Sequence, residues 1–127
     1  MRSIITTDEA PAPAGPYSQG VVSEDFVFTA GQIPTTPSGE TLNDQPIDVQ
    51  TRQCLENITE ILNEAGLEIR DIVKVTVFLS DIELLSDINE VYEEFFDAEP
   101  PARSAIAVSG IAKNVDIEIE AIAVKNQ

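Results

Sequence analysis

The feature that most constrains the fold of this 127-residue chain is a strict alternation near its C-terminus. Residues 115–124 read Val-Asp-Ile-Glu-Ile-Glu-Ala-Ile-Ala-Val. Successive side chains of a β-strand point to opposite faces of the sheet, so the odd-numbered residues form a wholly apolar face. The even-numbered face combines three carboxylates with Ile122 and Val124. A face that is only half polar predicts contact with a partner subunit.

Four further segments have the composition of strands. The segments are 21–22 and 26–30, expected as a hairpin, then 71–79 and 103–108, with a short extra strand near Ile4 and Ile5. Within 71–79, the spacing predicts that Val73, Val75, Val77 and Leu79 share one face. Residues 8–20 are rich in Pro and Gly and are expected to form an irregular loop.

Two segments have apolar residues at helical spacing. The first is expected to start at a cap on Asn43 or Asp44, with Pro46 at an early position, and to end at Gly66. Cys54 lies on its apolar stripe, which favours a buried core thiol over a nucleophile. The second helix is expected to start at a cap on Ser80 or Asp81 and to end before residues 100–101, which are both proline.

The predicted order of elements is therefore β-β-α-β-α-β-β. It indicates an α+β fold and a single domain over residues 1–127, with both helices on one face of one sheet. Such a length is sufficient to bury a substantial core.

The charge of the chain excludes several function classes. Asp and Glu number 23 against 7 Lys and Arg, for a formal net charge of -16. This charge repels nucleic acids and anionic membrane surfaces. The absence of a signal peptide or an apolar span, together with a single cysteine, predicts a cytoplasmic protein. Dispersed acidity with few lysines suggests a halophilic source, because concentrated salt screens the repulsion.

The chain has no histidine, so any chemistry depends on other groups. Arg103 can bind a carboxylate with its planar guanidinium, although a surface ion pair with a glutamate is the commoner arrangement. Glu118 and Glu120 share a face, where they either act in acid–base chemistry or are simply solvated. Tyr17 either anchors its loop to the core or lines a pocket, and Asn89 is expected to face solvent beside its helix stripe.

Five motifs in order along the chain resemble the RidA (YjgF) family of small deaminases. They are Ala14–Gly20, Thr29–Pro34, Asp71–Phe78, the group of Asn89 with Tyr92, Phe95 and Phe96, and Pro101–Ser104 together with residues 117–123. The resemblance implies a chorismate-mutase-like fold. In that fold a mixed sheet carries two helices on one face, and a homotrimer with a barrel-like centre has its active sites in clefts between subunits.

The resemblance also implies an activity. Family members hydrolyse 2-iminobutanoate, 2-iminopropanoate and their enamine tautomers to 2-oxo acids and ammonia, without a metal or other cofactor. Pyridoxal-phosphate enzymes release these imino acids. Some relatives are described instead as chaperone-like or metabolite-sensing proteins, and others as endoribonucleases, a function that the net charge disfavours.

Carried over residue by residue, the resemblance assigns roles to six positions. Arg103 matches the arginine that binds the substrate carboxylate, and Glu118, rather than Glu120, matches the glutamate near the attacking water. The remaining positions match residues that line or contact the substrate pocket: Tyr17, Gly31, Asn89 and Ala105. Two departures from the family pattern stand in this pocket, since Ala105 replaces a frequent Cys and Ala30 a frequent Ser.

Overall fold

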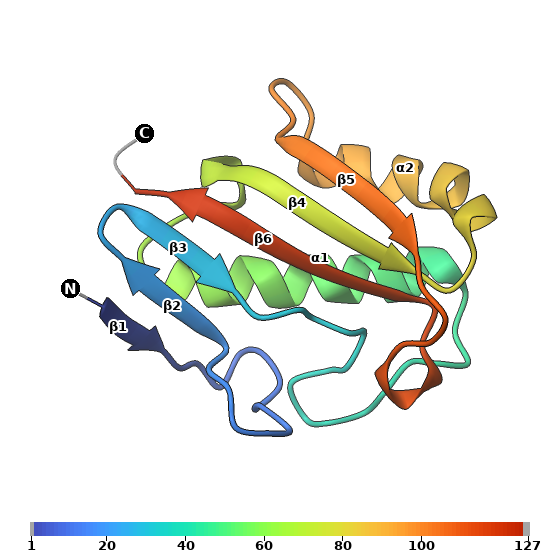
Figure 1. Ribbon diagram of the computed structural model, residues 1–127, viewed down its shortest axis with the longest axis horizontal. Coiled ribbons are helices and arrows are strands. Elements are labelled where there is room, and N and C mark those ends of the chain that lie inside the picture. Colours follow the sequence, from blue (N-terminus) through green and yellow to red (C-terminus); the bar gives the residue numbers. More distant parts are fainter. Residues whose placement is uncertain (1, 126–127) are drawn as a thin grey trace.

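A six-stranded mixed sheet forms one layer and two helices form the other, in a computed structural model that describes residues 2–125 (Figure 1). The strands are β1 (Arg2–Ile5), β2 (Gly20–Ser23), β3 (Phe26–Thr29), β4 (Ile72–Leu79), β5 (Ala102–Ala107) and β6 (Ile117–Val124), and the helices are α1 (Ile47–Glu64) and α2 (Leu85–Phe95). The strand order is β1-β2-β3-β6-β4-β5. Strands β4 and β5 are parallel, whereas the other neighbours are antiparallel. The predicted element order and fold class are confirmed.

The core lies between α1, α2 and the inner face of the sheet. As the alternation predicted, β6 buries its odd-numbered side chains and leaves the even-numbered ones half-buried on the opposite face. Helix α1 contributes Leu55, Ile58, Ile61 and Leu62, all fully buried. Cys54 is also fully buried, and burial raises the pKa of its thiol well above its usual value, as expected for a core residue.

Helix α1 ends as predicted but begins differently. Gly66 adopts a positive φ of 81°, and the N–H of Leu67 bonds to the carbonyl of Leu62, which is the Schellman arrangement. At the other end neither Asn43 nor Asp44 caps the helix, so that prediction was wrong. Pro46 itself occupies the N-cap position, because its extended ψ of 156° ends the preceding turn directly before Ile47.

Helix α2 is preceded by a 3-10 turn, Ile82–Leu84, whose first amides are capped by Asp81. The carboxylate of Asp81 accepts a hydrogen bond from the N–H of Glu83 at 2.9 Å, as predicted for this position. The hydroxyl of Ser80 donates instead to the carboxylate of Asp116, directly before β6. Two more 3-10 turns, Ile69–Asp71 and Ala112–Asn114, precede β4 and β6.

One strand prediction was wrong. Val73 is 39% exposed and does not share the buried face of Val75 and Val77. The pairing of β4 with β6 shifts between Ile72 and Lys74, so that Ile72 is buried in its place. Such a bulge inserts one residue into the alternation and reverses the faces that precede it.

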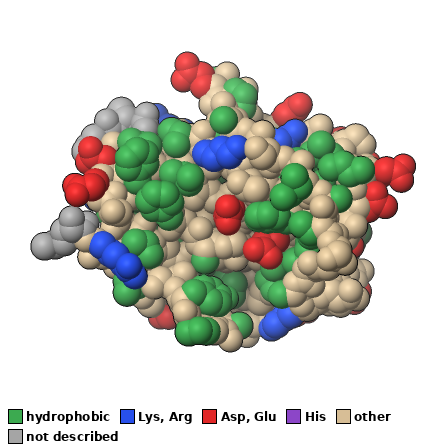
Figure 2. Space-filling model, in the orientation of Figure 1, with side chains coloured by type: hydrophobic (Ala, Val, Ile, Leu, Met, Phe, Trp, Pro, Cys, Tyr) green, Lys and Arg blue, Asp and Glu red, His purple; other side chains and the backbone are tan. Residues whose placement is uncertain are grey.

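The face of the sheet that carries no helix is partly apolar. Phe26 pairs with Val124 and Phe28 with Ile122, which places these four side chains together on that face. Both phenylalanines and Ile106 are exposed. Figure 2 shows hydrophobic side chains gathered over this face around a few acidic ones. We refer to it below as the open face.

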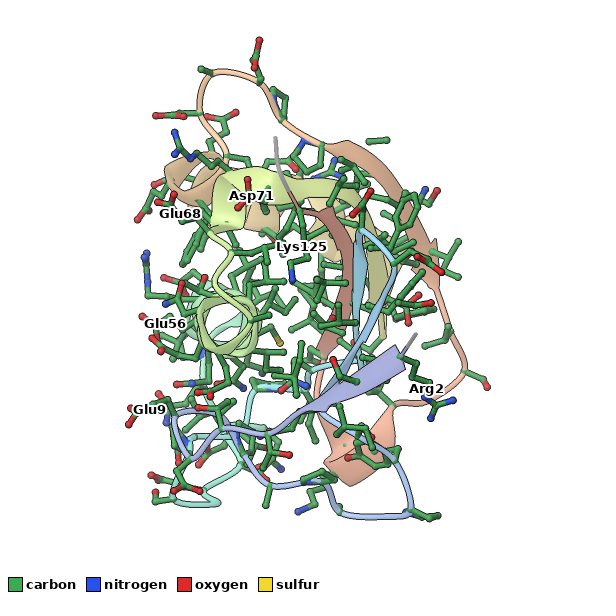
Figure 3. The ribbon with its side chains drawn as sticks, turned by 90° about the vertical axis from the view of Figure 1, so that its left-hand side faces the viewer. Arg2, Glu9, Glu56, Glu68, Asp71 and Lys125 are labelled. Carbon is green, nitrogen blue, oxygen red and sulfur yellow. The ribbon has the colours of Figure 1, made fainter. Side chains whose placement is uncertain are left out.

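Acidic side chains extend over the helical layer. Glu56 of α1, together with Glu9 and Glu68 of the loops beside the helices, points outward in Figure 3, and all three are exposed. Within residues 2–125 no helix has the length and apolarity needed to cross a membrane.

Candidate active site

The six predicted site residues fall into two groups on opposite faces of the sheet. Arg103 lies opposite Val75 in the pairing of β5 with β4, so its side chain is on the helical face. Glu118 lies opposite Phe78 in the pairing of β6 with β4, so its side chain is on the open face. Asn89 and Ala105 belong to the group of Arg103, whereas Tyr17 and Gly31 belong to the group of Glu118.

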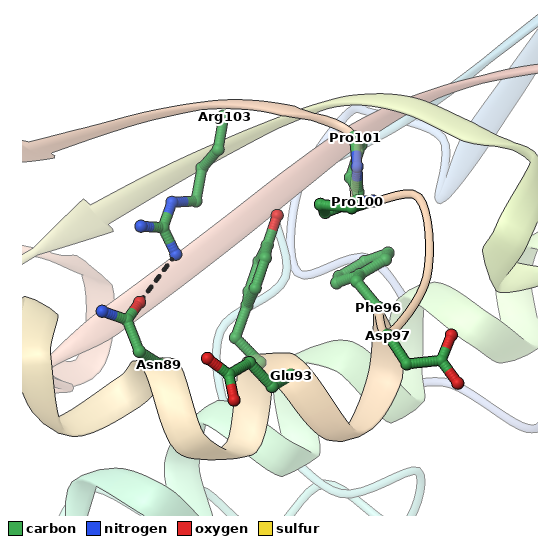
Figure 4. A pocket seen from close by; sticks show the side chains of 8 residues that line it. Asn89, Glu93, Phe96, Asp97, Pro100, Pro101 and Arg103 are labelled. Carbon is green, nitrogen blue, oxygen red and sulfur yellow. Dashed lines mark hydrogen bonds between the residues drawn. The ribbon is translucent and has the colours of Figure 1, made fainter.

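Arg103 and Asn89 of the first group line a cleft of about 710 Å³ between β5, the end of α2 and the loop that joins them (Figure 4). Its lining residues are Asn89, Tyr92, Glu93, Phe96, Asp97, Pro100, Pro101 and Arg103. Helix α2 ends at Phe95, and the consecutive prolines of the following loop lead the chain into β5, where Arg103 sits over α2. Asp97 points away from the guanidinium in Figure 4.

Neutral groups hold the guanidinium of Arg103. Its Nη1 donates a hydrogen bond to Oδ1 of Asn89 at 3.0 Å. Its Cζ lies 4.7 Å from the centroid of the Tyr92 ring, in cation–π contact. Among residues 2–125 it forms no ion pair, so the expected surface salt bridge was wrong. The charge of Arg103 therefore stays available to an external anion.

Other arginines in the chain do pair with carboxylates. Arg52 of α1 contacts Glu94 of α2 at 2.9 Å, and Arg70 contacts Glu68 at 3.1 Å. Both pairs are exposed, where ion pairs contribute little stability. The contrast shows that Arg103 differs from these arginines in its partners.

Asn89 is half-buried and bonded to Arg103, so its expected solvent-facing position was wrong. Sequence reasoning also gave Tyr92 no role in the site, although it named Tyr92 in one motif with Asn89. The spacing contained a usable indication, because residues three apart lie on the same face of a helix. Ala105, two residues beyond Arg103 on the same face of β5, is half-buried and packs against the core.

The second group centres on Glu118 and Gly31. Gln32 and Ile119 exchange two backbone hydrogen bonds, of 2.7 and 3.0 Å, which fixes Gly31 directly beside Glu118. A Cβ atom built on Gly31 would overlap Oε2 of Glu118 and would lie 2.9 Å from its Cδ. Glycine is therefore the residue that leaves room for this carboxylate.

Burial raises the pKa of the Glu118 carboxyl above its usual value, and repulsion by Glu120 adds to the rise. Both glutamates are half-buried, which rules out a pair of fully solvated carboxylates. The sequence left the two glutamates equivalent, whereas their environments distinguish them. A carboxyl group with a raised pKa exchanges protons more readily near neutral pH than an ordinary one.

Tyr17 is 52% exposed, so of the two alternatives for its ring the structure excludes anchoring in the core. Its hydroxyl accepts a hydrogen bond from the N–H of Ala14, within its own loop, at 3.1 Å. The ring lines a cavity of about 70 Å³ together with Gly31 and Lys113. Lys113 is a cation at this cavity that the sequence placed only in a connecting loop.

Buried Gln19 positions the loop that carries Tyr17. Its side-chain oxygen accepts from the N–H of Thr7 at 2.7 Å, and its amide nitrogen donates to the carbonyls of Thr7 and Pro11, both at 3.0 Å. These bonds satisfy backbone groups of a segment that has no regular structure. The loop consequently has a defined path past Gly31.

Comparisons with known proteins show what the whole chain is similar to. The family described as "Endoribonuclease L-PSP" matches residues 7–125. A RutC family protein of Pyrococcus horikoshii is 49% identical over 125 residues, covering 98% of this chain and 99% of its own. A 2-iminobutanoate/2-iminopropanoate deaminase of Salmonella typhimurium is 46% identical over 129 residues, covering 98% and 99%. The crystal structure of Escherichia coli TdcF with bound serine superposes with a TM-score of 0.92 at 46% identity, covering 97% and 98%.

Proposed function

Because the chain belongs to the RidA (YjgF) family, we propose that it hydrolyses reactive 2-imino acids, such as 2-iminobutanoate and 2-iminopropanoate, to 2-oxo acids and ammonia. The observation that carries the proposal is the guanidinium of Arg103, held in a cleft by neutral partners in a chain of net charge -16. An arginine in this state suits the carboxylate that every 2-imino acid contains.

In the proposed reaction Arg103 binds the substrate carboxylate through two parallel hydrogen bonds and so orients the imine carbon. Glu118 holds a water molecule and accepts its proton as the oxygen bonds to that carbon. Glu118 passes this proton to the imine nitrogen, which gives a carbinolamine. Glu118 then takes the proton of the carbinolamine hydroxyl and delivers it to the nitrogen as the C–N bond breaks, which releases ammonia and the 2-oxo acid.

Four further residues have supporting roles in the proposed reaction. Asn89 keeps the guanidinium of Arg103 in place, and Tyr17 and Gly31 shape the side of the pocket that holds Glu118. The backbone of Ala105, on the edge strand of the sheet, is proposed to contact the reacting nitrogen or oxygen. Modest catalysis is sufficient for this role, since imines also hydrolyse without an enzyme.

Arg103 and Glu118 of one chain are too far apart to share a small substrate. Strand β4 separates their strands, which places them about 10 Å apart across the sheet and about 10 Å along it, on opposite faces. We therefore propose that the Arg103 group of one copy faces the Glu118 group of another in a homotrimer. The exposed Phe26, Phe28 and Ile106 of the open face support this assembly.

The test couples the protein to a threonine or serine dehydratase and measures how fast 2-oxobutanoate or pyruvate forms. The wild type should accelerate formation, and Arg103→Ala should abolish the acceleration while the oligomer persists. Arg52→Ala removes the same charge from an exposed ion pair and is the matched control, with unchanged activity expected. Full acceleration by Arg103→Ala would exclude its role as the carboxylate anchor.

A second candidate function is binding of a metabolite without turnover. The TdcF structure, which contains serine, supports it because that relative holds an amino acid. Under this alternative, serine or a 2-oxo acid should raise the thermal midpoint of the protein while the coupled assay shows no acceleration.

A further inference from the structure

Tyr92 has a buried hydroxyl group without a hydrogen-bond partner among the described residues. Its side chain is only 6% exposed, and it lines the cleft of Arg103. Buried polar groups are nearly always paired, because an unpaired one loses its bonds to water without compensation. A phenylalanine would fill the same space without this cost. We therefore expect the hydroxyl to have a hydrogen-bond partner in another state of the protein.

The aromatic ring of Tyr92 is part of the same arrangement. Phe96 packs against it with the ring centroids 4.6 Å apart, and the guanidinium of Arg103 lies over it. The orientation of the Tyr92 ring is therefore fixed by Phe96 on one side and by Arg103 on the other. A hydroxyl on a fixed ring is preorganised for a ligand that binds to Arg103.

The hydroxyl is a donor at neutral pH. Burial raises the pKa of Tyr92, and the positive charge of Arg103 opposes that rise only partly, so the phenol stays protonated. A protonated phenol beside a guanidinium is best satisfied by an anionic acceptor, which both groups then bind together. A carboxylate has two oxygens, so it can accept hydrogen bonds from the phenol and from the guanidinium at the same time.

We propose that Tyr92 is a substrate-binding residue, whose ring supports Arg103 and whose hydroxyl donates a hydrogen bond to the carboxylate that Arg103 binds. This inference rests on the proposed function, since it takes the carboxylate of the 2-imino acid as the ligand. In the free protein Arg103 lies over the ring. Binding shifts the guanidinium toward the carboxylate, which admits one carboxylate oxygen to the hydroxyl.

The experiment measures the dissociation constant of 2-oxobutanoate, the stable product, by calorimetry on the intact oligomer of each variant. Tyr92→Phe removes the hydroxyl alone and should weaken binding about tenfold, which corresponds to one hydrogen bond to a charged group. Its thermal midpoint without ligand should equal or exceed that of the wild type, because an unpaired buried group is lost. Tyr92→Leu, which also removes the ring that supports Arg103, should weaken binding further.

Arg103→Gln is the reference for this series and should bind no 2-oxobutanoate. Unchanged affinity in Tyr92→Phe would overturn the role of the hydroxyl while leaving that of Arg103 intact. A lower thermal midpoint together with unchanged affinity would overturn it as well, and would assign the hydroxyl to a protein partner in the assembled state. Wild-type affinity in Arg103→Gln would instead contradict the proposed function itself.

Discussion

Replacing Gly31 with alanine tests the link between Glu118 and catalysis without touching a charged group. The added methyl would overlap Oε2 of Glu118 and lie 2.9 Å from Cδ and 3.2 Å from Cγ. To reach an ordinary contact, the carboxyl group has to move by more than about 1 Å. A misplacement of this size at a reacting group lowers the rate by about 100-fold, equivalent to about 2.7 kcal/mol in the barrier.

The fold should tolerate the same change. The backbone of Gly31 does not have a positive φ, and the overlapping atoms belong to the movable end of a side chain. Replacing glycine with alanine at a compatible position stabilises a protein by about 0.4–1 kcal/mol through the unfolded state. We therefore expect a thermal midpoint within a few degrees of the wild type, which separates loss of activity from loss of structure.

The assay is the dehydratase-coupled rate for Gly31→Ala, Glu118→Gln and the double variant. If Gly31→Ala acts by displacing Glu118, the double variant should lose less activity than the two single variants predict together. The reason is that the double variant has no functional carboxylate left to misplace. Gly110→Ala is the matched control, since a Cβ there meets no atom within 4 Å. Wild-type activity in Gly31→Ala, or additive losses, would refute the reasoning.

Four further predictions follow from the charges. Because Glu118 has a raised pKa, the acid limb of the pH–rate profile should lie above the usual glutamate value of 4.5, and Glu120→Gln should move it to lower pH by removing the repulsion. The pKa of Glu118 is higher in the folded than in the unfolded protein, so the free energy of unfolding falls as the pH rises through this pKa and the carboxyl group ionises. Glu118→Gln should therefore raise the thermal midpoint at pH 7 but not at pH 3. Asn89→Asp should place a carboxylate against Arg103 at almost constant volume and weaken 2-oxobutanoate binding, and calorimetry that gave wild-type affinity would contradict the anion-site argument. Molar KCl should raise the thermal midpoint of this chain of net charge -16, and an equal midpoint in dilute buffer would remove the halophile hypothesis.

The sequence predicted the elements of this fold where the governing pattern was local. The alternation over residues 115–124 and the stripes of α1 and α2 depend only on neighbours along the chain, and burial follows them. Val73 was misplaced because a bulge is a property of two paired strands, and nothing within β4 alone shows where its register with β6 shifts.

The family resemblance named the candidate site residues, but the sequence did not show how they are arranged. Periodicity favoured an ion pair for Arg103 because surface arginines in an acidic chain have many carboxylates nearby. The actual partners come from α2 and are fixed by how the loop at Pro100 and Pro101 sets β5 over that helix. Contacts between elements depend on this long-range packing, which a pattern in one element does not encode.

The division of the site between two faces has a consequence for how the proposed enzyme is controlled. If Arg103 of one copy and Glu118 of another form each cleft, an isolated chain holds both half-sites but no complete one. Specific activity should then fall on dilution below the dissociation constant of the assembly, and fall in proportion to the oligomer that remains. Variants of Phe26 or Phe28, which lie on the open face away from Arg103, should lower activity only through this loss of assembly. Under the proposed arrangement, any change that weakens the interface also lowers activity. An active site contained within one chain would instead stay active after the oligomer dissociates.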